Sequence, residues 1–110
     1  MKVQLSPEAE KDLFKTKFYI ANNLSNPIAA ENVTKRITKR LRSLSDNPRL
    51  GSPLSSIVDV ETDYRYLLCS KYYMAFYRIE EKRVYVDRII DGRRNYMKIL
   101  FGLPEEDEEE

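Results

Sequence analysis

The sequence predicts an α+β fold with a mainly antiparallel sheet of about four strands. Two adjacent segments in the first half place apolar residues three or four positions apart, which is typical of amphipathic helices. Three later segments between Tyr64 and Ile90 are rich in aromatic and β-branched residues and are separated by short turns, so they are expected to pair sequentially as antiparallel strands. A strand before the helices and a short helix after the last strand complete the expected order.

The chain has 110 residues, of which 42% are hydrophobic, and this suits one small domain with a modest core. We expect the domain to span residues 1–103. No apolar run approaches the roughly 20 residues that a membrane helix needs, and the N-terminus lacks the apolar region of a signal peptide. These observations predict a cytoplasmic protein without a membrane partner.

The formal charge of +1 hides an asymmetry along the chain. The segment 105–110 is entirely acidic, so residues 1–104 hold 19 basic and 12 acidic side chains, a net charge of +7. A body of this charge attracts nucleic acid or an acidic protein. Residues 104–110 are too charged to pack, and we expect a disordered acidic tail that keeps the protein soluble; the alternative is an intramolecular decoy for the basic body.

The N-terminal half begins with a strand, Lys2–Leu5, followed by the helix start signal Ser6-Pro7. This helix should run to about Leu24, and its expected inner face consists of Ala9, Leu13, Ile20 and Leu24.

Asn26-Pro27 repeats the start signal, so a second, antiparallel helix is expected, ending near Asp46-Asn47-Pro48. Its expected inner face consists of Ala30, Val33, Ile37, Leu41 and Leu44, and its basic outer face of Lys35, Arg36, Lys39, Arg40 and Arg42. The simplest interpretation of the outer face is a solvated surface.

Residues 48–63 are rich in Pro, Gly and Ser and predict an irregular connection, in which 57–60 is the one candidate strand. The strands 64–69, 72–79 and 83–90 follow. Alternation places Arg65, Leu67 and Cys69 on one face of the first of them. In the last strand it predicts one face made of Val84, Val86, Arg88 and Ile90.

The residue types exclude several kinds of chemistry. The chain has no His and a single Cys, so a Cys/His metal site is excluded, and we expect no metal and no cofactor. Cys69 has no imidazole to activate it and lies in an apolar strand, which favours a buried hydrophobic role over a nucleophilic one.

Arginines near the last strands point to an anion site. Arg65, Arg93 and Arg94 are expected to converge near a sheet edge and a helix start. Further candidates for anion or target binding are Arg49, Lys71 and Arg88. The structural alternative is that Arg65 pairs with Asp63 or Asp87, and Arg88 with Asp91.

The order of elements, the opening KVQLSPEAEKDL, the strand Tyr64-Arg65-Tyr66 leading into YYMAFYRI, and the ending VDRIIDGRRNYMKILF resemble the RelE/ParE family of toxins from bacterial type II toxin-antitoxin systems. The resemblance covers residues 1–102, and the ending is most similar to the ParE-like branch. It implies a toxin neutralised by a cognate antitoxin, and a toxin that contacts operator DNA only through that antitoxin.

Two targets are compatible with the resemblance. ParE-like members inhibit DNA gyrase, whereas RelE-like members are metal-free endoribonucleases that cleave mRNA in the ribosomal A site. Arg65 and Arg94 match arginines of the ribonucleases, and Tyr96 lies near their aromatic position. The lysine pair that those enzymes have before the sheet has no counterpart here, and a tyrosine base would need strong cationic neighbours. We therefore expect gyrase as the target, with ribonuclease activity of Arg65, Arg94 and Tyr96 as the alternative.

Overall fold

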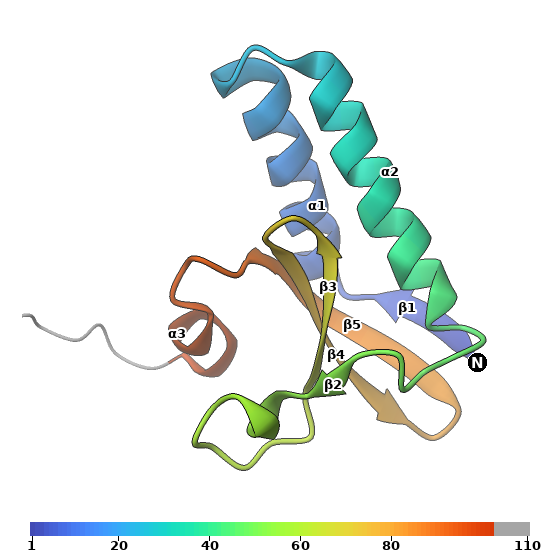
Figure 1. The fold of residues 1–110 in the computed structure, drawn as a ribbon. Helices are drawn as coiled ribbons and strands as arrows, with labels where there is room; N and C mark the ends of the chain where they lie inside the picture. The colour runs from blue at the N-terminus through green and yellow to red at the C-terminus, as the bar shows by residue number, and fades with distance from the viewer. Residues whose placement is uncertain (103–110) are drawn as a thin grey trace, which may run out of the picture.

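The computed structural model describes residues 1–102, and the predicted acidic tail lies outside them. Figure 1 shows a two-helix hairpin standing over a twisted sheet, with a short helix beside the sheet. The elements are β1 (Lys2–Leu5), α1 (Pro7–Phe18), the π-helix η1 (Tyr19–Asn23), α2 (Pro27–Ser43), β2 (Ser52–Pro53), the 3-10 helix η2 (Leu54–Ser56), β3 (Arg65–Ser70), β4 (Tyr73–Glu80), β5 (Arg83–Asp91) and α3 (Tyr96–Phe101). The predicted α+β class and the order of its main elements are confirmed.

The sheet has five strands in the order β1-β5-β4-β3-β2. β1 runs parallel to β5, and the other pairs are antiparallel. The fifth strand, which the sequence did not predict, is β2, a two-residue strand at the edge of the sheet. The candidate strand at 57–60 does not form, because η2 turns the chain away from the sheet edge after Leu54, whose side chain is fully buried.

The helix starts follow the predicted chemistry. Ser6 accepts a hydrogen bond from the Ala9 amide at 2.9 Å, and Asn26 caps α2 in the same way through the Ala29 amide at 3.0 Å. The Ser6 hydroxyl also donates to the Asp87 carbonyl of β5, which fixes the start of α1 to the sheet.

One predicted core position of the first helix is wrong. Leu24 is 55% exposed, because α1 continues into η1, where the Leu24 amide bonds to the Tyr19 carbonyl five residues back. This wider turn breaks the spacing that would place Leu24 beside Ile20. The tip of the hairpin also projects beyond the sheet (Figure 1).

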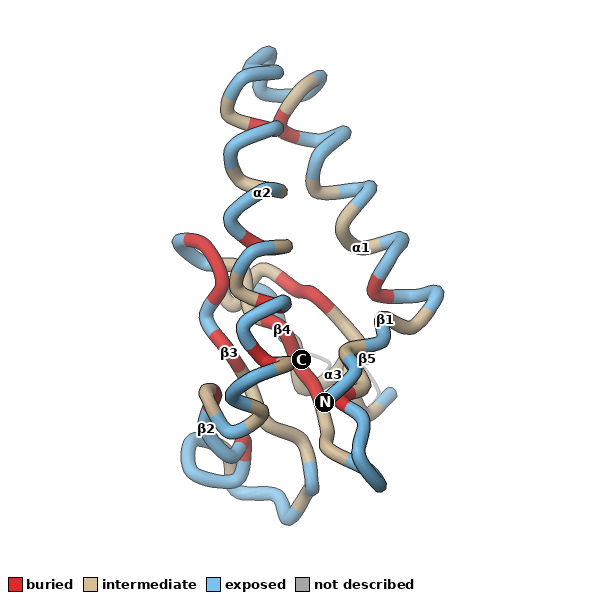
Figure 2. The backbone as a smooth tube through the Cα atoms, turned by 90° about the vertical axis from the view of Figure 1, so that its right-hand side faces the viewer, coloured by how far each residue is buried: buried red, intermediate tan, exposed pale blue. Residues whose placement is uncertain are grey.

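Two apolar cores lie on opposite faces of the sheet. The larger one packs α1 and α2 onto the sheet through Ala9, Ile37, Leu41 and Leu44. The smaller one, around Phe76, is closed by α3 and the loop that follows β2. In Figure 2 the buried residues run along the inner side of α2 and through the central strands.

A β-bulge changes the predicted faces of β5. Phe76 pairs with Arg88 and Tyr77 with Val86, so Asp87 is the extra residue of the bulged strand. Ile89 therefore joins Val84 and Val86 in the larger core, whereas Ile90 lies in the smaller one. The expectation of one continuous face from Val84 to Ile90 is wrong, because simple alternation does not include the inserted residue.

Candidate functional site

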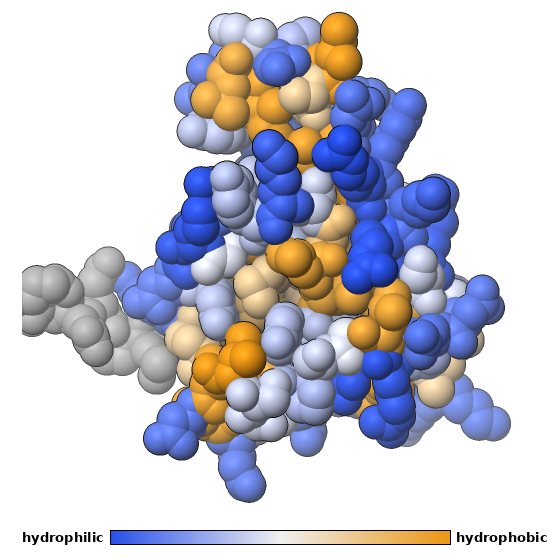
Figure 3. All heavy atoms as spheres, viewed as in Figure 1, coloured by the Kyte–Doolittle hydropathy of each residue, from blue (hydrophilic) through white to orange (hydrophobic). Residues whose placement is uncertain are grey.

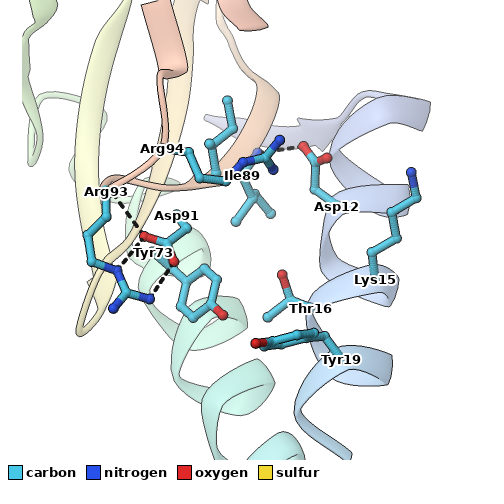
Figure 4. Close-up of a pocket in the computed structure, with 10 residues that line it drawn as sticks. Asp12, Lys15, Thr16, Tyr19, Tyr73, Ile89, Asp91, Arg93 and Arg94 are labelled. Atoms are coloured by element: carbon cyan, nitrogen blue, oxygen red, sulfur yellow. Dashed lines mark hydrogen bonds and ion pairs between the residues drawn. The ribbon is translucent and has the colours of Figure 1, made fainter. Parts of the chain in front are cut away.

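A cavity of about 370 Å³ opens between the helical hairpin and the end of β5. Figure 4 shows side chains of α1 and η1 on one side and residues at the end of the sheet on the other. We call it the hairpin pocket; it is lined by Asp12, Lys15, Thr16, Tyr19, Tyr73, Ile89, Ile90, Asp91, Arg93 and Arg94.

The turn after β5 places two arginines at this pocket. The Asp91 carboxylate accepts hydrogen bonds from the Arg93 amide at 2.9 Å and from the Arg93 guanidinium at 3.0 and 2.7 Å. The Arg93 guanidinium also lies 3.6 Å from the centroid of the Tyr72 ring. These bonds to Arg93 lower the pKa of Asp91, so the Asp91 charge is neutralised locally.

Gly92 lies in a closely packed part of this turn. A Cβ at this position would lie 2.5 Å from the sulfur of Met74 and 3.2 Å from the Tyr72 carbonyl oxygen. The Gly92 amide donates to that same carbonyl at 2.7 Å, which closes the turn against the preceding hairpin. The two arginines are therefore displayed from a tightly constrained turn.

A polar face of α1 forms the opposite side of the hairpin pocket. Asp12 accepts two hydrogen bonds from the Arg88 guanidinium, at 2.8 and 2.9 Å, and one from the Ile89 amide at 2.9 Å. Its charge is thus balanced by Arg88. The sequence prediction missed Asp12, Lys15, Thr16 and Tyr19, although their i, i+3, i+4, i+7 spacing places them on one helix face.

The pocket consequently has two cations in excess. Both of its carboxylates are bound to arginines, whereas Lys15 and Arg94 are exposed and have no ion pair among residues 1–102. Thr16, Tyr19 and Tyr73 also line the pocket, and their hydroxyl groups are able to donate hydrogen bonds. The arrangement suits a carboxylate or a phosphoryl group.

Arg65 lies elsewhere. In the sheet, Arg65 is the partner of Tyr77 on β4, whereas Asp91 is the partner of Tyr73. Tyr73 and Tyr77 are four positions apart, or about 13 Å along the strand. The Arg65 guanidinium donates to the Gly51 carbonyl at 2.7 Å and approaches the Arg49 carbonyl and the Tyr77 hydroxyl at 3.4 Å. Arg65 therefore does not converge with Arg93 and Arg94, and it does not pair with Asp63 or Asp87, because the 49–51 loop supplies main-chain acceptors.

The other predicted residues are scattered. Arg88 pairs with Asp12 instead of Asp91, and Lys71 is exposed in the β3–β4 turn at a positive φ of 48°. Arg49 is exposed in the loop before β2. The Tyr96 ring packs in the smaller core, 5.1 Å from the centroid of Phe76. Of the predicted set, Arg93 and Arg94 line the hairpin pocket, whereas Arg49 lies beside Arg65 at the loop before β2.

Two tyrosines and the cysteine near the sheet favour their neutral forms. Burial, together with the Asp91 charge, raises the pKa of Tyr73, and burial and Asp87 raise the pKa of Tyr64. Burial raises the pKa of the Cys69 thiol to about 11. Cys69 is thus a buried apolar residue, as predicted.

Two further findings concern metal ions and membranes. Within residues 1–102, no group of three or more His, Cys, Asp or Glu side chains is arranged to hold a metal ion. None of the helices in this described part is both long and apolar enough to cross a membrane.

Solved structures with a similar fold are toxins or toxin-antitoxin complexes. The chromosomal ParDE toxin-antitoxin system of P. aeruginosa gives a TM-score of 0.70 at 21% identity, covering 83% of this chain and 95% of that chain. The YoeB/ParE toxin of Agrobacterium tumefaciens gives 0.54 at 17% identity, with 81% and 95% covered. The YoeB-YefM complex of Staphylococcus aureus gives 0.50 at 17% identity, with 81% and 93% covered. The fold is therefore that of the ParE- and YoeB-type toxins.

The sequence itself defines the family. The model of the ParE toxin of the type II toxin-antitoxin system parDE matches residues 3–96, so the chain belongs to the ParE toxin family. The resemblance seen in the sequence is confirmed. A comparison with curated proteins finds no match.

Proposed function

We propose that this ParE-family toxin acts in the cytoplasm by binding and inhibiting DNA gyrase. The observation that supports binding over RNA cleavage is that Arg65, one of the residues that a ribonuclease would need, lies apart from Arg94. Arg65 is bonded to main-chain carbonyls and lies about 13 Å along the sheet from the turn of Arg94, while Tyr96 packs against Phe76.

The lack of a suitable general base also supports binding over RNA cleavage. Metal-free cleavage of RNA requires a group that removes the 2′-hydroxyl proton near neutral pH. The chain has no His, and the pKa values of Tyr64 and Tyr73 are raised, the opposite of what a tyrosine base requires. A binding inhibitor needs no such group. The hairpin pocket, with Lys15 and Arg94 unpaired among the described residues, is then the proposed contact for an acidic group of the target.

Two assays distinguish the mechanisms. We expect the purified toxin to inhibit supercoiling by gyrase, and primer extension on cellular mRNA after induction to show no new A-site cuts. The double variant Lys15→Ala/Arg94→Ala should weaken gyrase inhibition at least about tenfold, since each charged contact contributes roughly 1 kcal/mol or more. Lys11→Ala/Lys82→Ala, which changes exposed lysines on α1 and in the β4–β5 turn, is the matched control.

Two outcomes would contradict the proposed inhibition of gyrase. A-site cleavage that disappears in Arg65→Ala would establish the ribonuclease alternative. Unchanged growth on expression without an antitoxin would show that this copy is not toxic at all.

A cognate antitoxin is the proposed neutralising partner. The outer side and tip of the hairpin expose large apolar side chains, Phe14 (69%), Phe18 (55%), Leu24 (55%) and Ile28 (75%). Figure 3 shows apolar residues gathered at this tip above a largely hydrophilic surface. An amphipathic acidic segment of the antitoxin would cover this apolar surface and place carboxylates against the basic body.

Co-purification with the product of the adjacent open reading frame tests this partner. We expect Ile28→Asp to abolish the complex, because it places a charge in the apolar contact. Ile57→Asp, which changes an exposed isoleucine in the loop after η2, should leave the complex intact. Failure of the unmodified toxin to bind that product, or equal effects of the two substitutions, would contradict the assignment.

A further inference from the structure

The outer side of α2 forms a continuous basic surface. Lys35, Lys39 and Arg42 follow one another at positions i, i+4 and i+7, so they lie on one side of the helix. The opposite side contains the buried residues Ala30, Ile37 and Leu41. Arg36 is exposed beside this row. We refer to Lys35, Arg36, Lys39 and Arg42 as the basic face.

The charges of this face are not neutralised within the described chain. Glu31 is the one acidic residue of α2, and it is already bound to Lys17 at 3.1 Å. The hydrogen bond and charge of Lys17, with a smaller contribution from the charge of Lys35, lower the pKa of Glu31. No ion pair joins any member of the basic face to an acidic group among residues 1–102. The basic face is therefore available to an external anion.

Neighbouring polar groups are occupied by the protein itself. The Thr34 and Thr38 hydroxyls donate to carbonyls one turn earlier in α2, and the Arg40 side chain donates to the Leu68 carbonyl of β3. A shallow depression runs along the helix beside these residues, lined by Glu31, Thr34, Lys35, Thr38, Lys39 and Arg42. Hydrophilic side chains cover α2 below the hairpin tip in Figure 3.

The residue types exposed on the basic face indicate which kind of partner it fits. Protein interfaces rely on apolar and aromatic anchors, and single-stranded nucleic acid is held by stacking on aromatic rings. From Glu31 to Ser43 the exposed residues of α2 are all polar or charged, so both kinds of anchor are missing there. A duplex backbone requires only cations at a regular spacing, since phosphate contacts alone supply sequence-independent affinity.

We propose that the basic face of α2 binds the phosphate backbone of duplex DNA without regard to base sequence. This activity goes beyond the proposed inhibition of gyrase, because it requires neither gyrase nor the hairpin pocket. It is also compatible with an operator read by the antitoxin, since backbone contacts do not report sequence.

Fluorescence anisotropy of the full chain with a labelled duplex of about 20 base pairs tests the proposal across about 50 to 200 mM salt. The double variant Lys35→Gln/Lys39→Gln should make the negative slope of log affinity against log salt shallower by about 2. At about 0.1 M salt its affinity should fall roughly 10- to 100-fold, because each lost phosphate contact removes up to about one decade.

The charge-matched control is Lys11→Gln/Lys82→Gln, which changes exposed lysines on α1 and in the β4–β5 turn. It should retain the parental affinity to within about twofold and a salt slope nearer the parental value. Circular dichroism of both variants verifies that they fold. Equal losses in the two variants, no DNA binding by the parent chain, or tighter binding to duplex RNA or single strands would each overturn the proposal. Gyrase inhibition is measured separately, so its failure would not affect this result.

Discussion

Tyr77 is fully buried, yet its hydroxyl anchors the loop that precedes β2. It donates to the Pro48 carbonyl at 2.8 Å and accepts from the Gly51 amide at 3.0 Å. Arg65 adds a bond to the Gly51 carbonyl, so a polar cluster satisfies the main-chain groups of this loop. At the scale of single residues, a strand arginine that resembles a catalytic group thus has an identifiable structural role.

Replacement of Tyr77 by Phe is expected to lower the free energy of unfolding by about 1–3 kcal/mol, because the Gly51 amide loses its buried acceptor. Urea denaturation measures the change. Tyr85→Phe is the control, since its half-buried ring lies beside Arg78 and no hydrogen bond of its hydroxyl is seen in the described chain. A loss in Tyr85→Phe as large as in Tyr77→Phe would contradict this explanation.

Asp91 makes stability dependent on pH. The bonds to Arg93 lower the pKa of Asp91 in the folded state, so its stabilising contribution is complete above its ordinary pKa of about 4 and is lost as the pH falls through the lowered value. Unfolding free energies from pH 7 to about 2.5 should therefore decline less steeply below about pH 4 in Asp91→Asn than in the parent. Identical acid dependence in the two proteins would exclude this contribution.

At the scale of elements, β5 is the strand that organises both the fold and the pocket. β1 covers its edge only as far as Val86, and beyond this point Asp12 of α1 accepts the Ile89 amide. The bulge at Asp87 then places Ile89, instead of Ile90, in the same core as Val84 and Val86. Period-two alternation predicts strand positions well, but an inserted residue depends on pairing between strands, which local sequence does not encode here.

The contact between α1 and β5 is testable through Asp12. Asp12→Ala should destabilise the protein by about 1–3 kcal/mol, because a partly buried Arg88 and a main-chain amide lose their acceptor. Thermal and urea unfolding measure the loss. Asp46→Ala removes an exposed carboxylate after α2 and should change stability by less than about 0.5 kcal/mol. Similar effects of the two substitutions would contradict the assigned role of Asp12.

At the scale of the whole molecule, the distribution of charge separates two surfaces. The basic face of α2 is polar throughout, whereas the tip of the same hairpin is apolar (Figure 3). The proposed partners divide accordingly: duplex DNA along α2 and the antitoxin at the tip. The net charge of +7 for residues 1–104 favours approach of both.

We propose that the acidic segment 105–110 contributes to solubility and not to folding. Truncation after Pro104 should leave the unfolding midpoint within about 2 °C, because the removed residues are all charged. Retention on a cation-exchange column should increase, since the formal charge rises from +1 to +7. Solubility measured at equal ionic strength should fall. A large loss of thermal stability would show instead that the tail packs on the domain.

The amino-acid sequence alone establishes the order of the main elements, the helix starts at Ser6 and Asn26, the buried face of α2 and the toxin family. These features depend on local periodicity, capping chemistry and motif order, all of which a single chain displays. Only the tertiary structure decides which charged residues are available. Arg93 and Arg94 share a pocket with Lys15, whereas Arg65 and Arg88 are bound to Gly51 and Asp12. The reason is physical: a guanidinium bonds to whatever acceptor the fold brings within reach, and the acceptors of Arg65 and Arg88 come from segments far away in the sequence.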